Sequence, residues 1–376
     1  MRVIDIVIIG SGFFGSTIAR VLAQFGLKAL ILERRNHIGG NAWSEPDAET
    51  GIDVHKYGSH IFHTDNEKVW KFINQFTEFN EYRHSVWTTY EDQVYSMPIN
   101  LNTINSFYKK SLKPYEVNAF LQTEIGKEKY SNPKNLEEQA ISLIGRPLYE
   151  AFIKGYTIKQ WEKDPRELSP EIIKRLPVRN NYNLRYFSDP YEGIPLHGYG
   201  SLFRNLLNHE NISVELNTDW FAVKDQYLGK YPIVYSGPVD QFFDYKYGRL
   251  EWRSIELERQ VCDVSDYQGC SVMNYAGIDV PYTRIHEFKH FHPERPVSNN
   301  TVIFKEYSKI ISKTSEPYYP VNTPHNKELL EAYNKEASVL ENLWIGGRLG
   351  GYRYLDMDDT IREALKLADE ILKKYK

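Results

Sequence analysis

The chain has 376 residues, of which 41% are hydrophobic and 26% charged, and its net charge is −4. This length exceeds one compact core, so two or three subdomains are expected, and the slightly acidic balance argues against a general nucleic-acid or anionic-membrane surface. The two cysteines, Cys262 and Cys270, lack metal-site spacing, and no apolar run reaches the roughly 18 residues of a membrane span or the pattern of a signal peptide. We therefore expect a cytoplasmic protein with reduced thiols and without a metal, a nucleic-acid partner or a membrane segment.

The N-terminus predicts a nucleotide-binding βαβ unit. An apolar, β-branched strand over Val3–Ile9 leads directly into Gly10-Ser11-Gly12-Phe13-Phe14-Gly15. A helix over Ser16–Phe25 follows, and a second strand over Lys28–Leu32 ends at Glu33. In such a unit the glycines permit a tight turn, a close approach of the pyrophosphate and close helix–strand packing, and the helix N-terminus attracts the phosphates. Glu33 is placed to accept hydrogen bonds from ribose hydroxyls.

The next region, 67–185, has a largely helical pattern with proline-marked breaks. Its candidate helices are Glu67–Phe76, Pro114–Glu124, Asn135–Ile144 and Pro147–Lys154. The segment 177–195 is polar, aromatic and turn-rich, which is typical of a mobile surface loop. We expect residues 67–195 to form a mainly helical domain that contains this loop.

Strand-like patterns return after about residue 214. Alternating runs at Leu250–Leu257 and Thr301–Lys305 predict an antiparallel sheet over about 241–334, which would form a substrate domain. Further strands of the nucleotide domain are expected at Ile233–Gly237 and Leu343–Gly347, followed by a last helix over Thr360–Lys374. The nucleotide domain is therefore expected to be discontinuous, with pieces at 1–66, about 196–240 and 335–376.

The extended N-terminal pattern resembles the fingerprint of the glutathione-reductase-like FAD proteins. It continues at fixed intervals with Ala19, Leu22, Gly26, Gly39 and Gly40. One departure is Ala29, where a larger aliphatic residue is usual, and the segments Trp344–Arg348 and Tyr354–Asp358 fit the C-terminal flavin contact of such proteins. The resemblance implies FAD rather than NAD, and an α/β fold in which an FAD-binding Rossmann-like domain carries a helical insertion and an antiparallel-sheet substrate domain. The residues expected to bind the cofactor are Gly10, Gly12, Phe14, Gly15, Glu33, Arg34, Gly40, Asn41, His60, Ile61, Arg348, Asp356 and Met357.

Further motifs, in order along nearly the whole chain, resemble the UDP-galactopyranose mutase family and its bacterial branch in particular. They are HIGGN (37–41), HKYGSHIFHT (55–64), FIKGYT (152–157), KQW (159–161), IIKRLPVR (172–179), YFSD (186–189), PYTR (281–284), EPYYPV (316–321) and GGRL (346–349). The resemblance implies a non-redox isomerase that interconverts UDP-galactopyranose and UDP-galactofuranose through a covalent N5-flavin–sugar adduct on reduced FAD. It also implies a role in cell-surface polysaccharide synthesis, an electron donor that reduces the flavin, and a homodimer.

The same resemblance assigns roles to individual residues. Arg175 and Arg284 match positions near the diphosphate, and His60 matches the histidine beside the flavin; these three are the expected catalytic residues. Fixed cations stabilise the charge that develops as UDP leaves, and a guanidinium donates two aligned hydrogen bonds to a phosphate. The expected substrate-binding residues are His84, Phe152, Tyr156, Thr157, Trp161, Tyr186, Arg253, Asn274, Tyr319 and Tyr354.

Some roles and two alternative functions stay open. His84 stands where many relatives carry a small amide, and His63 matches the galactose-specific pattern, although UDP-N-acetylgalactosamine is a further possible substrate. A flavin amine-oxidase-like oxidoreductase would carry an aromatic cage over the flavin and no paired arginines. A binding protein like the GDP-dissociation inhibitors would carry a degraded cofactor site, yet Glu33, Gly39-Gly40 and Arg348 are present.

Overall fold

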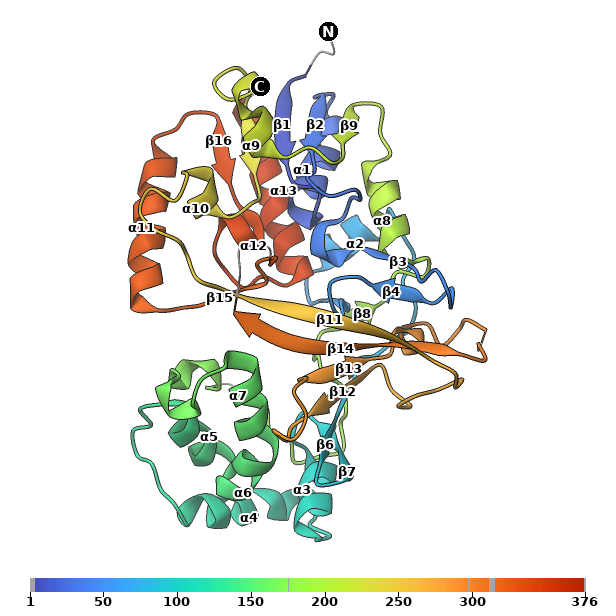
Figure 1. Cartoon of the computed structure of the whole chain (residues 1–376), viewed down its shortest axis with the longest axis vertical. Coiled ribbons are helices and arrows are strands. Elements are labelled where there is room, and N and C mark those ends of the chain that lie inside the picture. The colour runs from blue at the N-terminus through green and yellow to red at the C-terminus, as the bar shows by residue number, and fades with distance from the viewer. Residues whose placement is uncertain (1–3, 175, 297, 311–314, 375–376) are drawn as a thin grey trace.

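The computed structural model of the chain describes residues 4–174, 176–296, 298–310 and 315–374. Figure 1 shows a parallel sheet with its helices at the top, a helical bundle at the bottom, and the long strands β11 (Trp252–Cys262) and β14 (Thr301–Ile310) crossing between them. Within these residues every helix is too short or too polar to span a bilayer.

The parallel sheet has five strands in the order β16-β10-β1-β2-β9. Their bounds are β1 (Ile6–Ile9), β2 (Ala29–Leu32), β9 (Ile212–Glu215), β10 (Ile233–Tyr235) and β16 (Leu343–Ile345). Every residue of β1 and β2 is buried, as expected for strands that are covered on both faces and therefore read as continuous apolar runs. Strands far apart in the sequence thus meet in one sheet, since β1 pairs with both β2 and β10.

Helices cover both faces of this sheet. On one face, α1 (Phe13–Gln24) packs against α13 (Met357–Lys374) and α8 (Gly198–Leu207), and α2 (Glu67–Ile73) joins the same core. On the other face, Trp220 and Phe242 of the short helices α9 (Trp220–Val223) and α10 (Val239–Phe242) pack against the sheet. The doubly covered parallel sheet confirms the predicted α/β class.

The second sheet is mixed and has seven strands in the order β15-β11-β14-β13-β12-β6-β7. Besides β11 and β14, its strands are β6 (Val86–Tyr90), β7 (Gln93–Met97), β12 (Val272–Tyr275), β13 (Arg284–His286) and β15 (Tyr319–Pro320). The β6–β7 hairpin comes from the region with a mainly helical sequence pattern, and β6 extends the sheet by parallel pairing with β12. The buried residues of β6 include the polar Thr88, so the sequence of this strand lacks the alternation of apolar and polar residues that predicts a strand.

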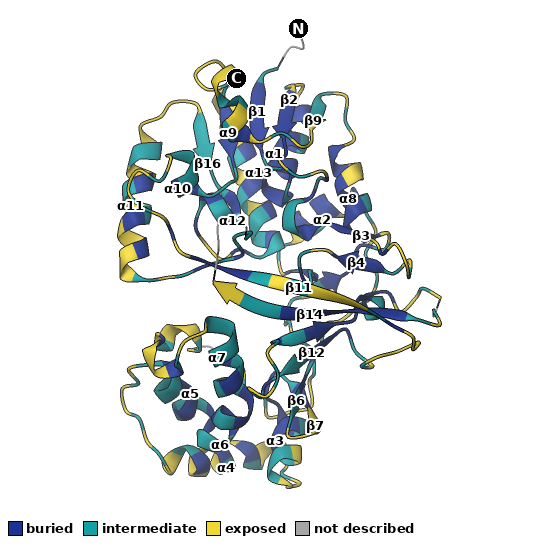
Figure 2. Ribbon diagram, viewed as in Figure 1, coloured by how far each residue is buried: buried dark blue, intermediate teal, exposed yellow. Residues whose placement is uncertain are grey.

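The bottom part is a helical bundle with its own hydrophobic core. Its helices are α3 (Leu101–Tyr108), α4 (Pro114–Gly126), α5 (Leu136–Ile144), α6 (Arg146–Leu148), a π-helix (Tyr149–Lys154) and α7 (Gly155–Trp161). Local signals start two of them: Pro114 occupies the first turn of α4, and the Asn135 side chain caps α5 by accepting from Glu138 N at 2.9 Å. The predicted helices at 114–124 and 135–144 are present, whereas 147–154 is divided between α6 and the π-helix. Figure 2 shows the buried faces of these helices turned toward one another and their exposed residues on the outside.

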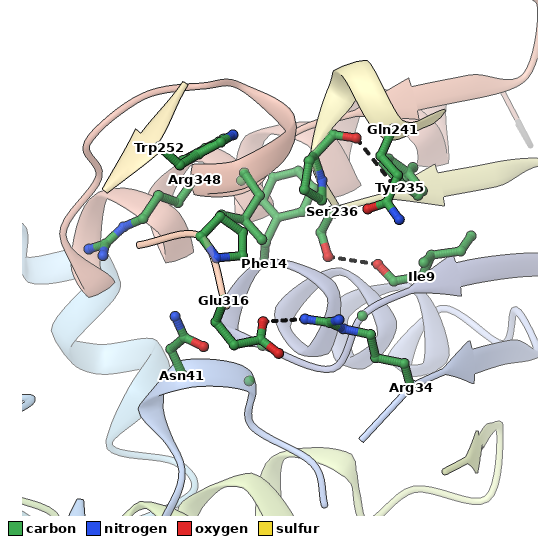
Figure 3. Close-up of a pocket in the computed structure, with 18 of the residues that line it drawn as sticks. Ile9, Phe14, Arg34, Asn41, Tyr235, Ser236, Gln241, Trp252, Glu316 and Arg348 are labelled. Atoms are coloured by element: carbon green, nitrogen blue, oxygen red, sulfur yellow. Dashed lines mark hydrogen bonds and ion pairs between the residues drawn. The ribbon is translucent and has the colours of Figure 1, made fainter. Parts of the chain in front are cut away.

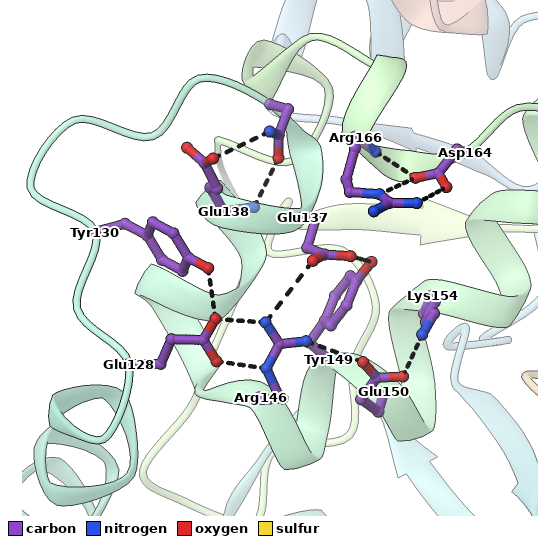
Figure 4. A network of polar contacts seen from close by, with 11 residues as sticks. Glu128, Tyr130, Glu137, Glu138, Arg146, Tyr149, Glu150, Lys154, Asp164 and Arg166 are labelled. Atoms are coloured by element: carbon purple, nitrogen blue, oxygen red, sulfur yellow. Dashed lines mark hydrogen bonds and ion pairs between the residues drawn. The ribbon is translucent and has the colours of Figure 1, made fainter.

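A network of charged residues braces the π-helix (Figure 4). Arg146 forms ion pairs with Glu128, with Glu137 at 3.7 Å and with Glu150 at 3.1 Å. Glu137 also accepts a hydrogen bond of 2.8 Å from the hydroxyl of Tyr149, the first residue of the π-helix. The network therefore joins the loop after α4 and helix α5 to the segment that carries Phe152 and leads into α7.

Short elements complete the chain. They are two antiparallel strand pairs, β3 (Ser44–Pro46) with β4 (Asp53–His55) and β5 (Phe62–Thr64) with β8 (Tyr191–Gly193), helices α11 (Pro324–Ser338) and α12 (Gly347–Gly350), and 3-10 helices at Gly40–Ala42, Pro165–Glu167, Pro170–Ile172, Lys224–Gln226 and Phe288–Phe291. Apart from β8, residues 177–195 form no regular element among those described. His63 fastens this segment to β5, because it pairs with Asp189 at 2.5 Å and stacks on Phe187 at 3.6 Å between ring centroids. The mobility of 177–195 stays a prediction.

Candidate active site

A cavity of about 890 Å³ opens at the carboxyl ends of β1, β2 and β10 (Figure 3). Ligands bind at this edge in open α/β sheets, and the volume lies in the range of cofactor pockets. Twelve of the residues predicted to bind the cofactor or the substrate line its wall, and ten of these are Gly10, Gly12, Phe14, Glu33, Arg34, Gly40, Asn41, His60, Trp161 and Arg348. Met357 and Arg253 line it as well.

Glycines bring two backbone segments into contact under this cavity. A Cβ added to Gly40 would lie 3.1 Å from Gly12 Cα, and Gly10 has a φ of +93°, which only glycine adopts readily. A Cβ added to Gly15 would lie 2.1 Å from the Gly10 carbonyl oxygen, so Gly15 permits close packing of α1 on the turn below the cavity rather than lining it. Gly10 thus lies at the turn, Gly12 and Gly40 bring two backbone segments together, and Gly15 packs against the turn. This arrangement leaves a backbone surface that a pyrophosphate can approach.

The carboxylate of Glu33 is buried at the end of β2 and oriented by three donors. It accepts hydrogen bonds from Ser11 N at 3.0 Å, from Ser11 Oγ at 2.6 Å and from Arg35 N at 2.9 Å. A carboxylate offers about four acceptor positions, so one remains for a ribose hydroxyl in the cavity that Glu33 lines. Together with the glycine contacts, this donor and acceptor set fits an adenine dinucleotide.

Arg34 and Arg35 meet Glu316 at the edge of the cavity. Arg34 forms an ion pair with Glu316 (Figure 3), and Arg35 lies 3.1 Å from the same carboxylate. Arg35 also donates to Asn41 Oδ1 at 2.8 Å. The pairing of Glu316 with Arg34 and Arg35 could not be predicted from the sequence, because nothing in the local pattern shows that residues so distant in the chain meet.

His60 and Arg348 mark the opposite end of the cavity. Burial lowers the pKa of His60 to about 4, so its imidazole is neutral at neutral pH. Because Nδ1 lies 2.7 Å from the Gly58 carbonyl oxygen, which only accepts, Nδ1 carries the proton and Nε2 is left as an acceptor. Arg348 donates to the Leu355 carbonyl from Nε at 3.1 Å and from Nη2 at 2.5 Å.

The remaining predicted cofactor residues lie close to this end but differ in what they contact. Met357 is the first residue of α13, three positions before the predicted start at Thr360, and burial raises the pKa of the preceding Asp356. Ile61 is 8% exposed and packs in a hydrophobic cluster with Ile194 and Phe288. The structure therefore gives Ile61 a packing position.

A second group of predicted residues surrounds Arg284 at the start of β13. Thr88, Asn274, Arg284 and Glu306 lie in one row across the second sheet, so their side chains share a face. Arg284 donates a hydrogen bond to the Tyr156 hydroxyl, and its Nε lies 3.3 Å from Glu306 Oε1. A guanidinium, an amide and a phenol thus converge on one face, and this set suits a phosphorylated ligand.

Three tyrosines predicted to bind the substrate lie at this group. The rings of Tyr319 and Tyr354 stack at 5.8 Å between centroids, and Arg348 lies 5.0 Å above the Tyr354 ring. Tyr354 and Tyr186 are 59% and 50% exposed, which leaves their hydroxyls accessible to a ligand. Arg348 contacts the second group through Tyr354 and lines the cavity as well, so the two groups are adjacent.

His84 lies beside Tyr186, with 5.5 Å between ring centroids. Burial lowers the pKa of His84 to about 3, and Nδ1 lies 2.9 Å from the Tyr82 hydroxyl. Its backbone N–H donates to Glu192 Oε1 at 2.5 Å. His84, a predicted substrate-binding residue, is therefore a neutral and anchored imidazole.

Of the other predicted substrate residues, Phe152 and Thr157 are buried, whereas Arg253 makes polar contacts. Phe152 is 5% exposed and packs on Tyr95 at 5.0 Å between centroids in the core of the helical bundle, and Thr157 is 7% exposed. Arg253 donates from Nη2 to the Gln160 carbonyl and to Ser308 Oγ, each at 2.9 Å, and so fixes the end of α7 next to Trp161. Arg175 lies outside the described residues.

Glu306 and His286 belong to this site, although neither was predicted from the sequence, and Ser59 of the motif at 55–64 contacts His286. Burial alone would raise the pKa of Glu306, but Arg284 and a hydrogen bond from His286 outweigh it and lower the pKa to about 2. His286 is fully buried. The only sequence signal for Glu306 is a glutamate within an apolar strand run, and its partner is set by the β13–β14 register.

The parallel sheet with its glycine contacts and oriented carboxylate defines a protein with a Rossmann-like dinucleotide-binding domain. A family model described as an NAD(P)-binding Rossmann-like domain matches residues 8–76, and the UDP-galactopyranose mutase model matches residues 151–354. The chain belongs to the UDP-galactopyranose mutase family of flavoproteins. This confirms the resemblance seen in the motifs.

Similar proteins match over almost the whole chain. A Klebsiella pneumoniae protein named "Probable UDP-galactopyranose mutase" is 47% identical over 98% of this chain and 94% of its own. The dTDP-fucopyranose mutase of Escherichia coli is 42% identical over 99% of both chains, and the UDP-galactopyranose mutase of Mycoplasma pneumoniae is 31% identical over 98% of this chain and 96% of its own. A crystal structure of a reduced UDP-galactopyranose mutase matches with a TM-score of 0.75 at 16% identity, covering 99% of this chain and 94% of that chain. This last likeness concerns the fold.

Proposed function

We propose that the protein interconverts UDP-galactopyranose and UDP-galactofuranose without net redox change, with FAD in its reduced form as the cofactor. One observation carries the proposal: the Arg284–Tyr156 pair and the stacked Tyr319 and Tyr354 stand next to the His60 and Arg348 end of the dinucleotide cavity. A diphosphate held there places its sugar at the flavin end.

The residues of this group have distinct tasks in the proposed reaction. Arg284, with Arg175 as its expected partner, stabilises the negative charge on UDP as the anomeric bond breaks. The hydroxyls of Tyr156, Tyr319 and Tyr354 donate to the same diphosphate and hold it in place while the sugar changes its ring size. Reduced FAD, when bound, supplies the electron-rich N5 as the nucleophile toward the anomeric carbon.

The cofactor end is kept neutral and oriented by the protein. Neutral His60 presents Nε2 as an acceptor and adds no charge beside the flavin. Glu33 holds the ribose of the adenosine half, and Arg34 and Asn41 line the route between the two ends. We further propose that an electron donor reduces the flavin, that the enzyme works as a cytoplasmic homodimer, and that galactofuranose is used for cell-surface polysaccharides; these points rest on the family.

A second candidate substrate is dTDP-fucopyranose, which the name of the Escherichia coli relative gives. Thymine adds a methyl group to uracil, dTDP lacks the ribose 2′-hydroxyl, and fucose lacks the hydroxyl at C6 of galactose. Both sugar nucleotides present the same diphosphate to Arg284, so the proposed chemistry is common to them. UDP-N-acetylgalactosamine is the third substrate to compare.

The test is turnover of UDP-galactofuranose by the purified, FAD-loaded protein, with oxidised and with dithionite-reduced flavin. We expect conversion to UDP-galactopyranose only with reduced flavin. Chromatography of the nucleotides measures the conversion. Parallel assays with dTDP-fucofuranose and the N-acetylated sugar nucleotide rank the substrates by kcat/KM. A reduced, loaded protein that converts none of the three would overturn the proposal and favour an oxidase.

A further inference from the structure

A chain of polar contacts leads from Arg284 to the turn before His60. Arg284 Nε lies 3.3 Å from Glu306 Oε1, and Glu306 Oε2 lies 2.8 Å from His286 Nε2. His286 Nδ1 in turn lies 2.6 Å from Ser59 Oγ. The contacts cross from β14 to β13 and then leave the sheet for the segment between β4 and β5. They join the two groups of the candidate site through the interior of the protein.

The carboxylate orients the imidazole of His286. Glu306 is ionised at neutral pH, so it accepts, and His286 Nε2 carries the proton that it donates. This bond turns His286 Nδ1 toward Ser59 Oγ, 2.6 Å away, and the contact holds the Ser59 hydroxyl. The carboxylate, the imidazole and the hydroxyl thus form one row of oriented side chains.

The first contact in the chain is weaker than the others. Arg284 Nε is buried and has no hydrogen-bond acceptor among the described residues, so its contact with Glu306 is an ion pair without a well-aligned hydrogen bond. Glu306 instead has a good hydrogen bond to His286. A guanidinium held in this way can turn toward an anionic ligand while the carboxylate stays on the imidazole.

The last contact holds a tight turn that carries His60. Gly58 has a φ of +96°, and the His60 backbone N–H donates to His55 Nδ1 at 3.0 Å. The turn is therefore held on one side by His55 and on the other by His286 through Ser59. Since the His60 side chain lines the dinucleotide cavity, a shift of Ser59 moves a group at the flavin end.

We propose that Glu306 and His286 are positioning residues that couple occupancy of the anion site at Arg284 to the placement of His60 beside the flavin. An anion at Arg284 draws the guanidinium from Glu306. The carboxylate then bonds more strongly to His286, and the change reaches the 58–60 turn through Ser59. The coupling rests on the proposed function, because it takes the diphosphate and the flavin as the two ligands.

The test uses the FAD-loaded protein, titrated with UDP as the probe, and records the flavin absorption difference spectrum along with the Kd from calorimetry. Ser59→Ala removes only the last contact, and Glu306→Gln removes the charge at the centre. Matched controls are Ser298→Ala, since Ser298 bonds Asn300 away from the site, and Glu258→Gln, since Glu258 pairs with Tyr307 and Lys305 on the exterior.

In the parent protein and both controls, UDP should perturb the flavin spectrum. In Ser59→Ala the Kd for UDP should stay within about twofold, while the amplitude of the spectral change falls at least threefold and kcat falls about tenfold at little changed KM. Glu306→Gln should lose the spectral response and also weaken UDP binding. Two outcomes would overturn the coupling and leave the proposed function standing. In one, the flavin spectrum of Ser59→Ala responds to UDP like that of the parent. In the other, the parent turns over substrate although UDP leaves its flavin spectrum unchanged. A parent that binds no UDP would overturn both.

Discussion

Glu306 is an ionised carboxylate in the interior, where an unpaired charge is costly, and two partners compensate it: Arg284 and His286. Glu306 therefore links stability to function. If Arg284 is substituted, the site loses a ligand-binding group, and the buried Glu306 carboxylate also loses its ion-pair partner. Substitutions at the site therefore need a stability measurement beside each activity measurement.

For Arg284→Ala we expect kcat to fall about 100- to 1000-fold, because a fixed donor to the developing charge is lost. Flavin should remain bound, since Arg284 does not line the dinucleotide cavity. The free energy of unfolding should fall by about 2 kcal/mol, because Glu306 loses its ion pair. Turnover, flavin absorbance and urea unfolding measure the three effects. The control is Arg353→Ala, which breaks an exposed pair with Glu363; near-normal turnover in Arg284→Ala would place the phosphate site elsewhere.

For Glu33→Ala we expect weaker flavin retention with the fold preserved. The substitution removes the acceptor for a ribose hydroxyl and for Ser11 and Arg35, so the turn that approaches the pyrophosphate is less well held. The ratio of flavin to protein absorbance after gel filtration measures the effect. Glu215→Gln is the matched control, since Glu215 ends the neighbouring strand β9 and is exposed. Equal flavin occupancy in both variants would contradict the ribose role.

At the scale of elements, the Arg146 network links the segments of the helical bundle around the π-helix. Such helices occur often at functional sites, and this one carries Phe152 and continues into the helix of Tyr156. For Arg146→Ala we expect a loss of about 1–2 kcal/mol in unfolding free energy, since three carboxylates lose their common, partly exposed partner. Urea unfolding gives the value. Arg166→Ala, which breaks one exposed pair with Asp164, should cost less than half as much, and an equal loss in both would argue against a network effect.

Sequence patterns predicted the elements whose signals are local. The β1–α1–β2 unit, α4, α5 and the last helix follow from apolar periodicity, glycine spacing and caps. The β6–β7 hairpin was missed, because its pairing partner β12 lies about 180 residues away and its inward residues include a polar threonine. The division of 147–154 into α6 and a π-helix was missed as well, since both have a helical period.

The same distinction holds for the candidate site. Residues in motifs, such as Gly10, Glu33 and Arg284, could be singled out from the sequence. Glu306 and His286 could not, because their roles come from strand register. Ser59 lies in the motif at 55–64, but its contact with His286 comes from a turn that only the folded chain brings to that strand. Register is a property of pairs of segments, and a single sequence carries it only weakly.

At the scale of the whole molecule, three histidines with strongly lowered pKa values make stability depend on pH. Burial lowers the pKa of His55 to about 3, of His60 to about 4 and of His84 to about 3. In the unfolded chain these groups keep a pKa near 6.5, so the unfolded state binds more protons between about pH 6.5 and pH 4. Stability should therefore be full above this window and be lost as the pH falls through it, by up to about 1.4 kcal/mol per pH unit for each histidine.

Urea unfolding of the FAD-loaded protein between about pH 7.5 and 4.5 checks this dependence. The variant His84→Asn should reduce the slope by about one proton, whereas His325→Asn, at an exposed position of α11, should leave it unchanged. A stability that is flat from pH 6.5 to pH 5 in the parent would contradict the burial of these imidazoles.

The strand order of the parallel sheet also bears on how the protein is made. Strand β1 leaves the ribosome first, yet its neighbour β10 begins at Ile233 and the edge strand β16 at Leu343. At a synthesis rate of about 5–20 residues per second, β1 waits on the order of 10 to 45 seconds for β10. During this time an apolar strand edge is open to pairing with other nascent chains. Production of the protein will accordingly depend on translation speed and on chaperones that shield this edge, and the cofactor can be retained only once the segment up to Thr360, which completes the cavity, has been synthesised.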